Sequence, residues 1–361
     1  MYKTLLKPLF FSMDPEVAHD WMRFGGRFAN NAPLSGLLET FFGVRDSRLQ
    51  VEVAGLSFPN PIGLAAGLDK NVELVGLLRG LGFGHLELGT VTGQPQAGNP
   101  KPRIFRIGDE RALINRMGFP SEGADVARER LKTVRGRFKS LPPIGINIGK
   151  SKVVELEHAI DDYKYSFERL APLADYVTVN VSSPNTQGLR QLQERDRLTA
   201  LLQSLAASNT DKRPIFVKVA PDLELSALEE VVDVCLQCGV AGVIATNTTI
   251  SRDSLRSSIQ EAGGLSGAPL RDKSLEVVRF LGCIINRRMV LIGVGGISSV
   301  DDVLAMLAAG ASMVQVYTGL IYEGPGLIKA LNQQLIWYMD RHGCRSLNDA
   351  VSAWSEERKV A

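Results

Sequence analysis

The chain has 361 residues, of which 45% are hydrophobic and 22% charged, as expected for a folded globular protein and not for a disordered one. Its 41 basic and 39 acidic residues leave a net charge of +2, which does not favour a nucleic-acid-binding surface. Four scattered cysteines argue against a disulfide scaffold and favour a reducing compartment.

Two amphipathic segments occupy the first thirty residues. Asp14 followed by Pro15 predicts the start of the second helix, because a carboxylate caps free backbone N–H groups and proline fits the first turn. The large apolar residues at helical spacing are Leu5, Leu6, Leu9, Phe10, Val17, Trp21, Phe24 and Phe28, with Lys3, Lys7, Arg23 and Arg27 nearby. Two interpretations stay open: the helices pack on the main domain, or they lie on a membrane surface.

The N-terminal part carries neither a membrane-spanning pattern nor a leader pattern. No apolar run reaches the roughly 18 residues needed to cross a bilayer. The apolar start runs into Asp14 without a small-residue cleavage site, so we expect no signal peptide.

A stretch rich in Asn, Pro and Gly, residues 29–43, is expected to be a linker. The alternation of polar and apolar residues over 49–58 then predicts a β-hairpin. We therefore predict an N-terminal helical extension with its linker over residues 1–43 and one main domain over residues 44–361.

Short apolar runs of strand character alternate with longer amphipathic segments through the main domain. The expected strands are Pro61–Ala65, His85–Gly89, Ile144–Ile148, Tyr176–Val181, Ile215–Val219, Val243–Ala245, Val290–Val294 and Met313–Val316. Eight such units predict an α/β fold of the (β/α)8 TIM-barrel type. A doubly wound sheet is disfavoured because no Gly-x-Gly-x-x-Gly follows the first strand.

Glycine-rich segments follow the last two expected strands. These are Gly293–Gly296 and Tyr317–Gly319. In such barrels the loops after strands seven and eight bind phosphate through backbone N–H groups, so a phosphate-bearing ligand is expected.

Polar side chains end nearly every expected strand, where the chemistry of a TIM barrel is located. Four of them are asparagines, Asn115, Asn180, Asn185 and Asn247, which donate and accept hydrogen bonds and suit a planar ligand with carbonyl and N–H edges. No histidine or carboxylate cluster accompanies them, so no metal site and no two-carboxylate hydrolase is expected. Cys235 and Cys238 have metal-ligand or redox spacing but lie in a helical pattern without a second pair.

Lys218 emerges from a buried strand and needs an anionic partner or a lowered pKa. It is interpreted either as a Schiff-base lysine of an aldolase or as a fixed cation beside an electron-rich cofactor. Lys70 next to Asp69 is more simply interpreted as a surface pair.

Together the motifs closely resemble the dihydroorotate dehydrogenase family. They are Gly-Leu-Ala-Ala-Gly-Leu-Asp-Lys (63–70), Gly-Asn-Pro-Lys-Pro-Arg (98–103), Asn-Arg-Met-Gly-Phe (115–119), Asn-Val-Ser-Ser-Pro-Asn-Thr (180–186), Gly-Gly-Leu-Ser-Gly (263–267), Ile-Gly-Val-Gly-Gly-Ile (292–297) and Val-Gln-Val-Tyr-Thr-Gly (314–319). The resemblance implies an enzyme that contains flavin mononucleotide (FMN) and oxidises (S)-dihydroorotate to orotate in pyrimidine biosynthesis. Ser183 stands where the soluble branch has cysteine, and the helix pair is present, so the chain resembles the quinone-dependent, membrane-associated branch.

The resemblance also implies a role for individual residues. The FMN site would comprise Ala66, Gly67, Leu68, Asp69, Lys70, Thr90, Asn147, Asn180, Lys218, Thr246, Gly267, Gly296, Tyr317 and Thr318. The substrate would be held by Lys70, Asn115, Arg116, Met117, Gly118, Phe119, Asn180, Asn185, Asn247 and Thr248. A quinone passage would be lined by His19, Arg106 and Tyr317. The family usually has another asparagine where this chain has Pro120.

In the implied mechanism, Ser183 removes a proton from C5 while a hydride passes from C6 to the flavin, and Lys218 stabilises the reduced ring. A membrane quinone would accept the electrons. We expect a monomeric peripheral protein on the cytoplasmic face of a bacterial inner membrane. Two alternatives stay open: an aldolase acting through Lys218, and a non-catalytic peripheral membrane module that binds a phosphate ligand.

Overall fold

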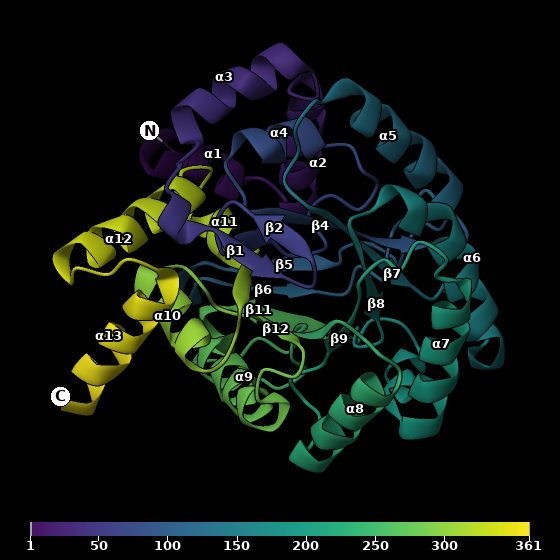
Figure 1. The fold of residues 1–361 in the computed structure, drawn as a ribbon. Helices are drawn as coiled ribbons and strands as arrows, with labels where there is room; N and C mark the ends of the chain where they lie inside the picture. Colours follow the sequence, from purple (N-terminus) through teal and green to yellow (C-terminus); the bar gives the residue numbers. More distant parts are fainter. Residues whose placement is uncertain (1, 361) are drawn as a thin grey trace.

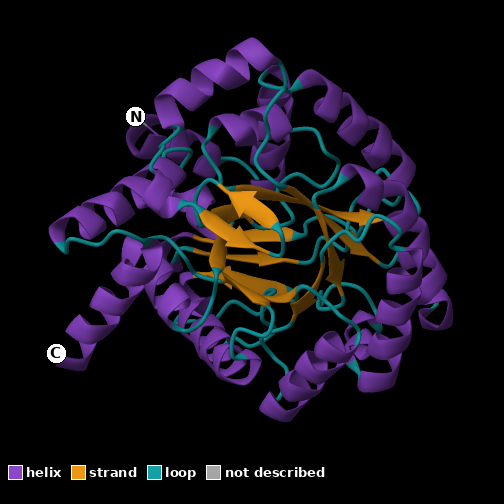
Figure 2. Cartoon of the chain, viewed as in Figure 1, coloured by secondary structure: helices purple, strands orange, loops and turns teal. Residues whose placement is uncertain are grey.

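In the computed structural model, which describes residues 2–360, the chain folds around a closed barrel of eight parallel strands (Figure 2). The barrel strands are β3 (Ile62–Leu64), β4 (His85–Thr92), β7 (Ile144–Gly149), β8 (Tyr176–Asn180), β9 (Ile215–Val219), β10 (Gly242–Ala245), β12 (Val290–Val294) and β13 (Met313–Val316). They pair in chain order, and β13 closes on β3. Each expected strand is found within a few residues, and the (β/α)8 barrel is confirmed.

Helices surround this barrel (Figure 1). Those that follow the barrel strands are α4 (Val75–Gly80), α5 (Ala124–Arg137), α6 (Ala159–Leu170), α7 (Arg195–Ser208), α8 (Leu225–Gln237), α9 (Arg271–Ile285), α10 (Val300–Ala308), α11 (Thr318–Glu323), α12 (Leu327–Arg341) and α13 (Leu347–Val360). Local sequence sets their starts where caps are present: Ser299 and Asp302 form a reciprocal capping box at α10. Cys235 is buried within α8 and Cys238 caps its end, as the helical pattern there predicts.

The expected hairpin closes the end of the barrel at which the strands begin. It consists of β1 (Val51–Val53) and β2 (Leu56–Phe58), and Phe58 is buried against a cluster that includes Tyr176, Phe216 and Met313. Because this end is plugged by apolar side chains, a ligand can enter only from the opposite end.

A small antiparallel sheet stands at the end of the barrel where the strands finish. It is formed by β5 (Ile104–Ile107), β6 (Ala112–Asn115) and β11 (Gly264–Gly267), with β6 in the centre. Thr249, just after β10, bridges to Leu265 in β11. The sheet thus joins the loop after β4 to the loop after β10.

The N-terminal residues form α1 (Lys7–Ser12), preceded by a short π-helical turn, α2 (Pro15–Phe28) and α3 (Ala32–Phe42). Asp14 caps α2 with Pro15 in its first turn, as predicted. The expectation of a linker over residues 29–43 is wrong for most of its length, because α3 fills it. Asn31 caps α3 and Pro33 lies in its first turn, so residues taken as breakers mark a helix start.

Helix α2 leaves an apolar face uncovered. Val17, Trp21, Phe24 and Phe28 are 46%, 60%, 57% and 62% exposed. Within residues 2–360 no helix combines the length and apolar character that crossing a membrane requires.

Candidate active site

A pocket opens at the carboxyl ends of the barrel strands, and most of the residues predicted for the site line it. Predicted residues in its wall are Ala66, Gly67, Lys70, Thr90, Asn115, Met117, Gly118, Phe119, Asn180, Ser183, Asn185, Lys218, Thr246, Asn247, Thr248, Gly267, Gly296, Tyr317 and Thr318. Predicted residues outside the wall are His19, Leu68, Asp69, Arg106, Arg116 and Asn147. The barrel therefore gathers into one cavity residues as far apart in the sequence as Ala66 and Thr318.

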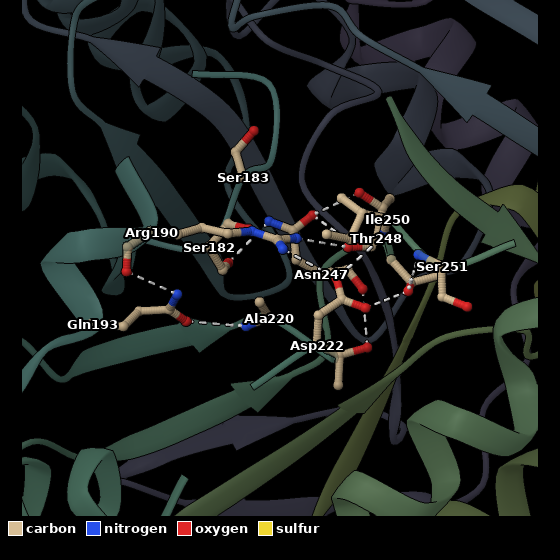
Figure 3. Close-up of polar contacts among 12 residues, drawn as sticks. Ser182, Ser183, Arg190, Gln193, Ala220, Asp222, Asn247, Thr248, Ile250 and Ser251 are labelled. Atoms are coloured by element: carbon tan, nitrogen blue, oxygen red, sulfur yellow. Dashed lines mark hydrogen bonds and ion pairs between the residues drawn. The ribbon is translucent and has the colours of Figure 1, made fainter. Parts of the chain in front are cut away.

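The loop after β8 carries Ser183 into this pocket. Ser183 is buried, and its Oγ accepts a hydrogen bond from the backbone N–H of Asn185 at 3.3 Å. In Figure 3 its side chain points away from the polar contacts made by the neighbouring Ser182. The two adjacent side chains thus point in different directions, and of the two only Ser183 lines the pocket.

The asparagine amides are held by one another. Asn247 Nδ2 donates to Ser182 Oγ at 2.9 Å and to Asn180 Oδ1 at 3.3 Å. Asn185 Nδ2 donates to the backbone oxygen of Asn115 at 3.1 Å. Because these bonds fix the orientation of each amide plane, the pocket presents donors and acceptors in set directions.

Lys70 is a cation of the pocket wall, and the interpretation of Asp69 and Lys70 as a surface pair is wrong. Asp69 is buried and accepts bonds from the backbone N–H groups of Glu73 and Leu74, both at 2.8 Å. Burial, reinforced by the nearby cations Arg23 and Arg103, lowers the pKa of Lys70 to about 8. Lys70 is half-buried, and an ammonium group that is partly desolvated beside other cations is stabilised by an anionic ligand.

Lys218 has the anionic partner that its buried position requires. Its Nζ lies 3.3 Å from Oε1 of Glu87, which is fully buried in β4. Glu87 also accepts bonds from Asn147 at 2.8 Å, Thr178 at 3.2 Å and Gln315 at 2.9 Å. Glu87 was missed from sequence, although its place two residues after His85 in a buried strand puts it on the inner face.

Asn147 lies behind the pocket wall and positions two residues of it. Its Oδ1 accepts bonds from Thr90 Oγ1 at 2.6 Å and from Asn180 Nδ2 at 3.1 Å, while its own Nδ2 binds Glu87. Arg116 turns outward, pairs with Glu261 at 2.6 Å and lies over the ring of Phe105.

Glycines bring backbone close to the other end of the pocket. Gly267, Gly295 and Gly296 have φ values of +96°, +137° and +70°. A Cβ at Gly267 would lie 2.3 Å from the carbonyl oxygen of Arg111, so only glycine fits there. Thr318, which begins α11, bonds Ser266 at 2.9 Å across this end. Backbone and hydroxyl groups here suit the phosphate of a nucleotide-like cofactor.

The three residues predicted for a quinone passage do not share one cavity. Tyr317 lines the main pocket. Arg106 lines a second cavity between α1 and β5, donates to the carbonyl oxygen of Phe10 at 3.0 Å and lies 4.8 Å from the ring centre of Phe11. His19 is half-buried in α2, and burial with nearby Lys70 and Arg23 holds its pKa well below the usual range. Ile104 borders both cavities.

Sequence and structure comparisons find relatives that match most of the chain. A family described as dihydroorotate dehydrogenase matches residues 48–339. A protein of Gloeobacter violaceus named dihydroorotate dehydrogenase (quinone) is 51% identical over 347 residues, covering 96% of this chain and 97% of that one. A protein of the same name from Natronomonas pharaonis is 47% identical and covers 96% and 97%. The crystal structure of the Eimeria tenella enzyme DHODH with ferulenol superposes with a TM-score of 0.86 at 37% identity, covering 96% and 98%.

Proposed function

Because the chain belongs to the dihydroorotate dehydrogenase family, we propose that it oxidises (S)-dihydroorotate to orotate in pyrimidine biosynthesis and passes the electrons to a quinone. A flavin, which we assign as FMN, supplies the hydride acceptor when bound. The observation that carries the proposal is the convergence of Lys70, Ser183 and the fixed amides in one pocket.

Lys70 and the amides account for recognition of the substrate. Dihydroorotate carries a carboxylate and a ring of alternating carbonyl and N–H groups. The Lys70 ammonium group matches the carboxylate, and the amides of Asn115, Asn180, Asn185 and Asn247 match the ring edges. The amides need not reorient when the substrate binds, because they are already held by one another.

Ser183 is assigned as the base that receives the proton from C5. A serine hydroxyl is a weak base, so its own proton must pass to a bound water or a neighbouring hydroxyl as it takes the C5 proton. The oxygen that gives up this proton needs a donor that stabilises its negative charge. The N–H of Asn185, 3.3 Å from Oγ, is placed to do this. Burial of the loop keeps bulk water from competing for the same oxygen.

The cofactor is assigned to the side of the pocket that carries the glycines. Gly267, Gly296 and Thr318 would hold its phosphate, and Thr90, Lys218 and Thr246 would hold its ring. Lys218 keeps its place because Glu87 binds it, and this pairing disfavours the aldolase alternative, whose lysine must act as a neutral amine.

We assign the quinone to the space between the N-terminal helices and the barrel, near Arg106 and Tyr317. The second cavity and Ile104, which borders both cavities, support this route. The exposed apolar face of α2 would rest on the cytoplasmic surface of the cell membrane, with the protein as a monomer.

An absorbance spectrum before and after anaerobic dihydroorotate tests the function. We expect flavin bands that bleach on addition and recover with a quinone. Ser183→Ala should keep its flavin and bleach about 10²- to 10⁴-fold more slowly. Ser251→Ala, on a neighbouring loop outside the pocket, is the matched control and should bleach normally. A protein that stays colourless after FMN is supplied contradicts the proposal.

A further inference from the structure

The guanidinium group of Arg190 connects two loops of the active site. Arg190 lies in a 3₁₀ turn, Leu189–Gln193, that follows the loop carrying Ser183. Its Nε donates to the carbonyl oxygen of Ser182 at 3.1 Å and its Nη2 to that of Thr248 at 3.4 Å. Figure 3 shows this side chain reaching from the first loop toward the second. One planar group therefore sets the separation between the loop after β8 and the loop after β10.

A carboxylate with little exposed surface, that of Asp222, holds this guanidinium group in place. Arg190 Nη1 binds Oδ2 of Asp222 at 3.1 Å, and the Asp222 side chain is 11% exposed. The same carboxylate accepts bonds from Lys273 Nζ at 2.7 Å, from the N–H of Ile250 at 3.1 Å and from the hydroxyl of Thr249. With four donors on its two oxygens, the carboxylate is fixed, and Arg190 is fixed with it.

The bond to Ser182 acts directly on the peptide that precedes Ser183. A peptide unit is planar, so fixing the carbonyl oxygen of Ser182 also fixes the backbone nitrogen of Ser183. Ser182 Oγ in turn accepts the bond from Asn247 at 2.9 Å. Ser182 is therefore held through its backbone by Arg190 and through its side chain by Asn247.

We propose that Arg190, anchored by Asp222, is a positioning residue. It holds Ser183 and the Asn247–Thr248 segment at the separation that lets both act on the same substrate molecule. The inference rests on the proposed function of the pocket. Arg190 does not line the pocket itself, and its contact with a residue of the wall is the bond to the backbone oxygen of Thr248. Its contribution is geometric, and a shift of the base by about 1 Å can cost about 10²-fold in rate.

Substitutions at Arg190 separate its fork geometry from its charge. Lysine can still pair with Asp222, but a single ammonium group cannot bind two carbonyl oxygens in the same fixed plane. Arg190→Lys and Arg190→Met should therefore both be impaired. Asp222→Asn keeps the shape of the Asp222 side chain but removes the negative charge opposite Arg190 and Lys273. It should be impaired less than the two Arg190 variants. Arg195→Ala is the matched control, since Arg195 pairs with Asp233 on the outer helices at 3.5 Å.

The experiment uses flavin-loaded protein and anaerobic stopped flow, with rates expressed per bound flavin. At saturating dihydroorotate we expect Arg190→Met and Arg190→Lys to be about 10- to 100-fold slower than Arg195→Ala. With substrate deuterated at C5, the isotope effect should rise in the Arg190 variants, because proton removal by a misplaced Ser183 becomes slower. A residue that only stabilised the fold would leave this isotope effect unchanged.

Hydrogen exchange gives a readout that needs no substrate. Exchange over residues 181–190 and 247–252 should be faster in Arg190→Met than in Arg195→Ala. Unchanged exchange, an unchanged isotope effect, or wild-type rates in either Arg190 variant overturns the positioning role. If wild-type protein is not reduced by dihydroorotate, the proposed function fails instead, while the exchange result still decides whether Arg190 holds the loops.

Discussion

Substituting Glu87 by glutamine should destabilise the protein without breaking its hydrogen-bond network. The amide oxygen can take the place of Oε1, which accepts from Asn147 and Lys218. The amide nitrogen then faces the hydroxyl of Thr178, which can accept, and the amide of Gln315, whose Oε1 has no hydrogen-bond partner and can turn to accept. Glu87→Gln therefore removes the charge opposite Lys218 and little else.

The expected loss follows from the burial of both partners. The side chains of Lys218 and Glu87 are 6% and 0% exposed. Removing one partner of such a buried pair costs about 3–5 kcal/mol, because the other charge is left without compensation. For 361 residues, at about 2.1 cal/mol/K of unfolding entropy per residue, this loss lowers the Tm by about 4–7 °C.

The assay is thermal unfolding with excess FMN, so that cofactor occupancy does not differ between variants. Lys218→Met should be similarly destabilised, since it leaves the Glu87 carboxylate unpaired. The double variant Glu87→Gln, Lys218→Met should be more stable than the sum of the two losses predicts. A Tm of Glu87→Gln within about 1 °C of wild type, or simple additivity in the double variant, would refute the reasoning.

Three further predictions concern charge and the N-terminal helices. Because burial and the nearby Arg23 and Arg103 lower the pKa of Lys70 to about 8, orotate affinity should fall by up to about tenfold per pH unit above pH 8, as measured by flavin absorbance titration. Lys70→Met should abolish this dependence. Burial raises the pKa of Glu16 and Glu73, but their arginine partners bring it below 4.5. The stability from these pairs is therefore present above about pH 4.5 and lost as the pH falls through the folded-state pKa. In acid unfolding, Glu16→Gln should lose less stability with falling pH than the wild type does. Deleting residues 2–30 should impair quinone turnover. It should also raise the KM for dihydroorotate in flavin reduction, because Arg103 loses its partner Glu16. An unchanged KM would contradict a connection between these helices and the substrate loops.

The barrel was predictable because its strands are continuous apolar runs. Such runs are typical of parallel strands that are buried on both faces, and the residues that follow the strands of a parallel barrel must meet at one end. Ser183 and Asn247 were found in this way, since each directly follows such a strand. For these two residues, the apolar strand that precedes each of them is enough to predict a place at the carboxyl end of the barrel.

The residues that support the site were not predictable in the same way. Glu87 and Lys218 are paired across 131 positions, and Arg190 and Asp222 come from separate loops. Nothing in the local pattern of either partner identifies the other. Asp69 and Lys70 show the same limit, since adjacent opposite charges suggest a surface pair until the fold buries Asp69 against the backbone N–H groups of Glu73 and Leu74.

The N-terminal helices illustrate how function depends on such distant partners. Periodicity predicts α2 and its exposed apolar face, but not that the opposite face is joined to the catalytic loops. Glu16 binds Arg103 at 2.7 Å, and Arg103 binds the carbonyl oxygens of Ala97 and Asn99. Asn99 donates in turn to the carbonyl oxygens of Arg116 and Asn185, on either side of the substrate pocket. The helix that we propose to rest on the membrane is therefore connected through one buried ion pair to the loops that we propose to hold dihydroorotate. In this proposal the two half-reactions share a structural support.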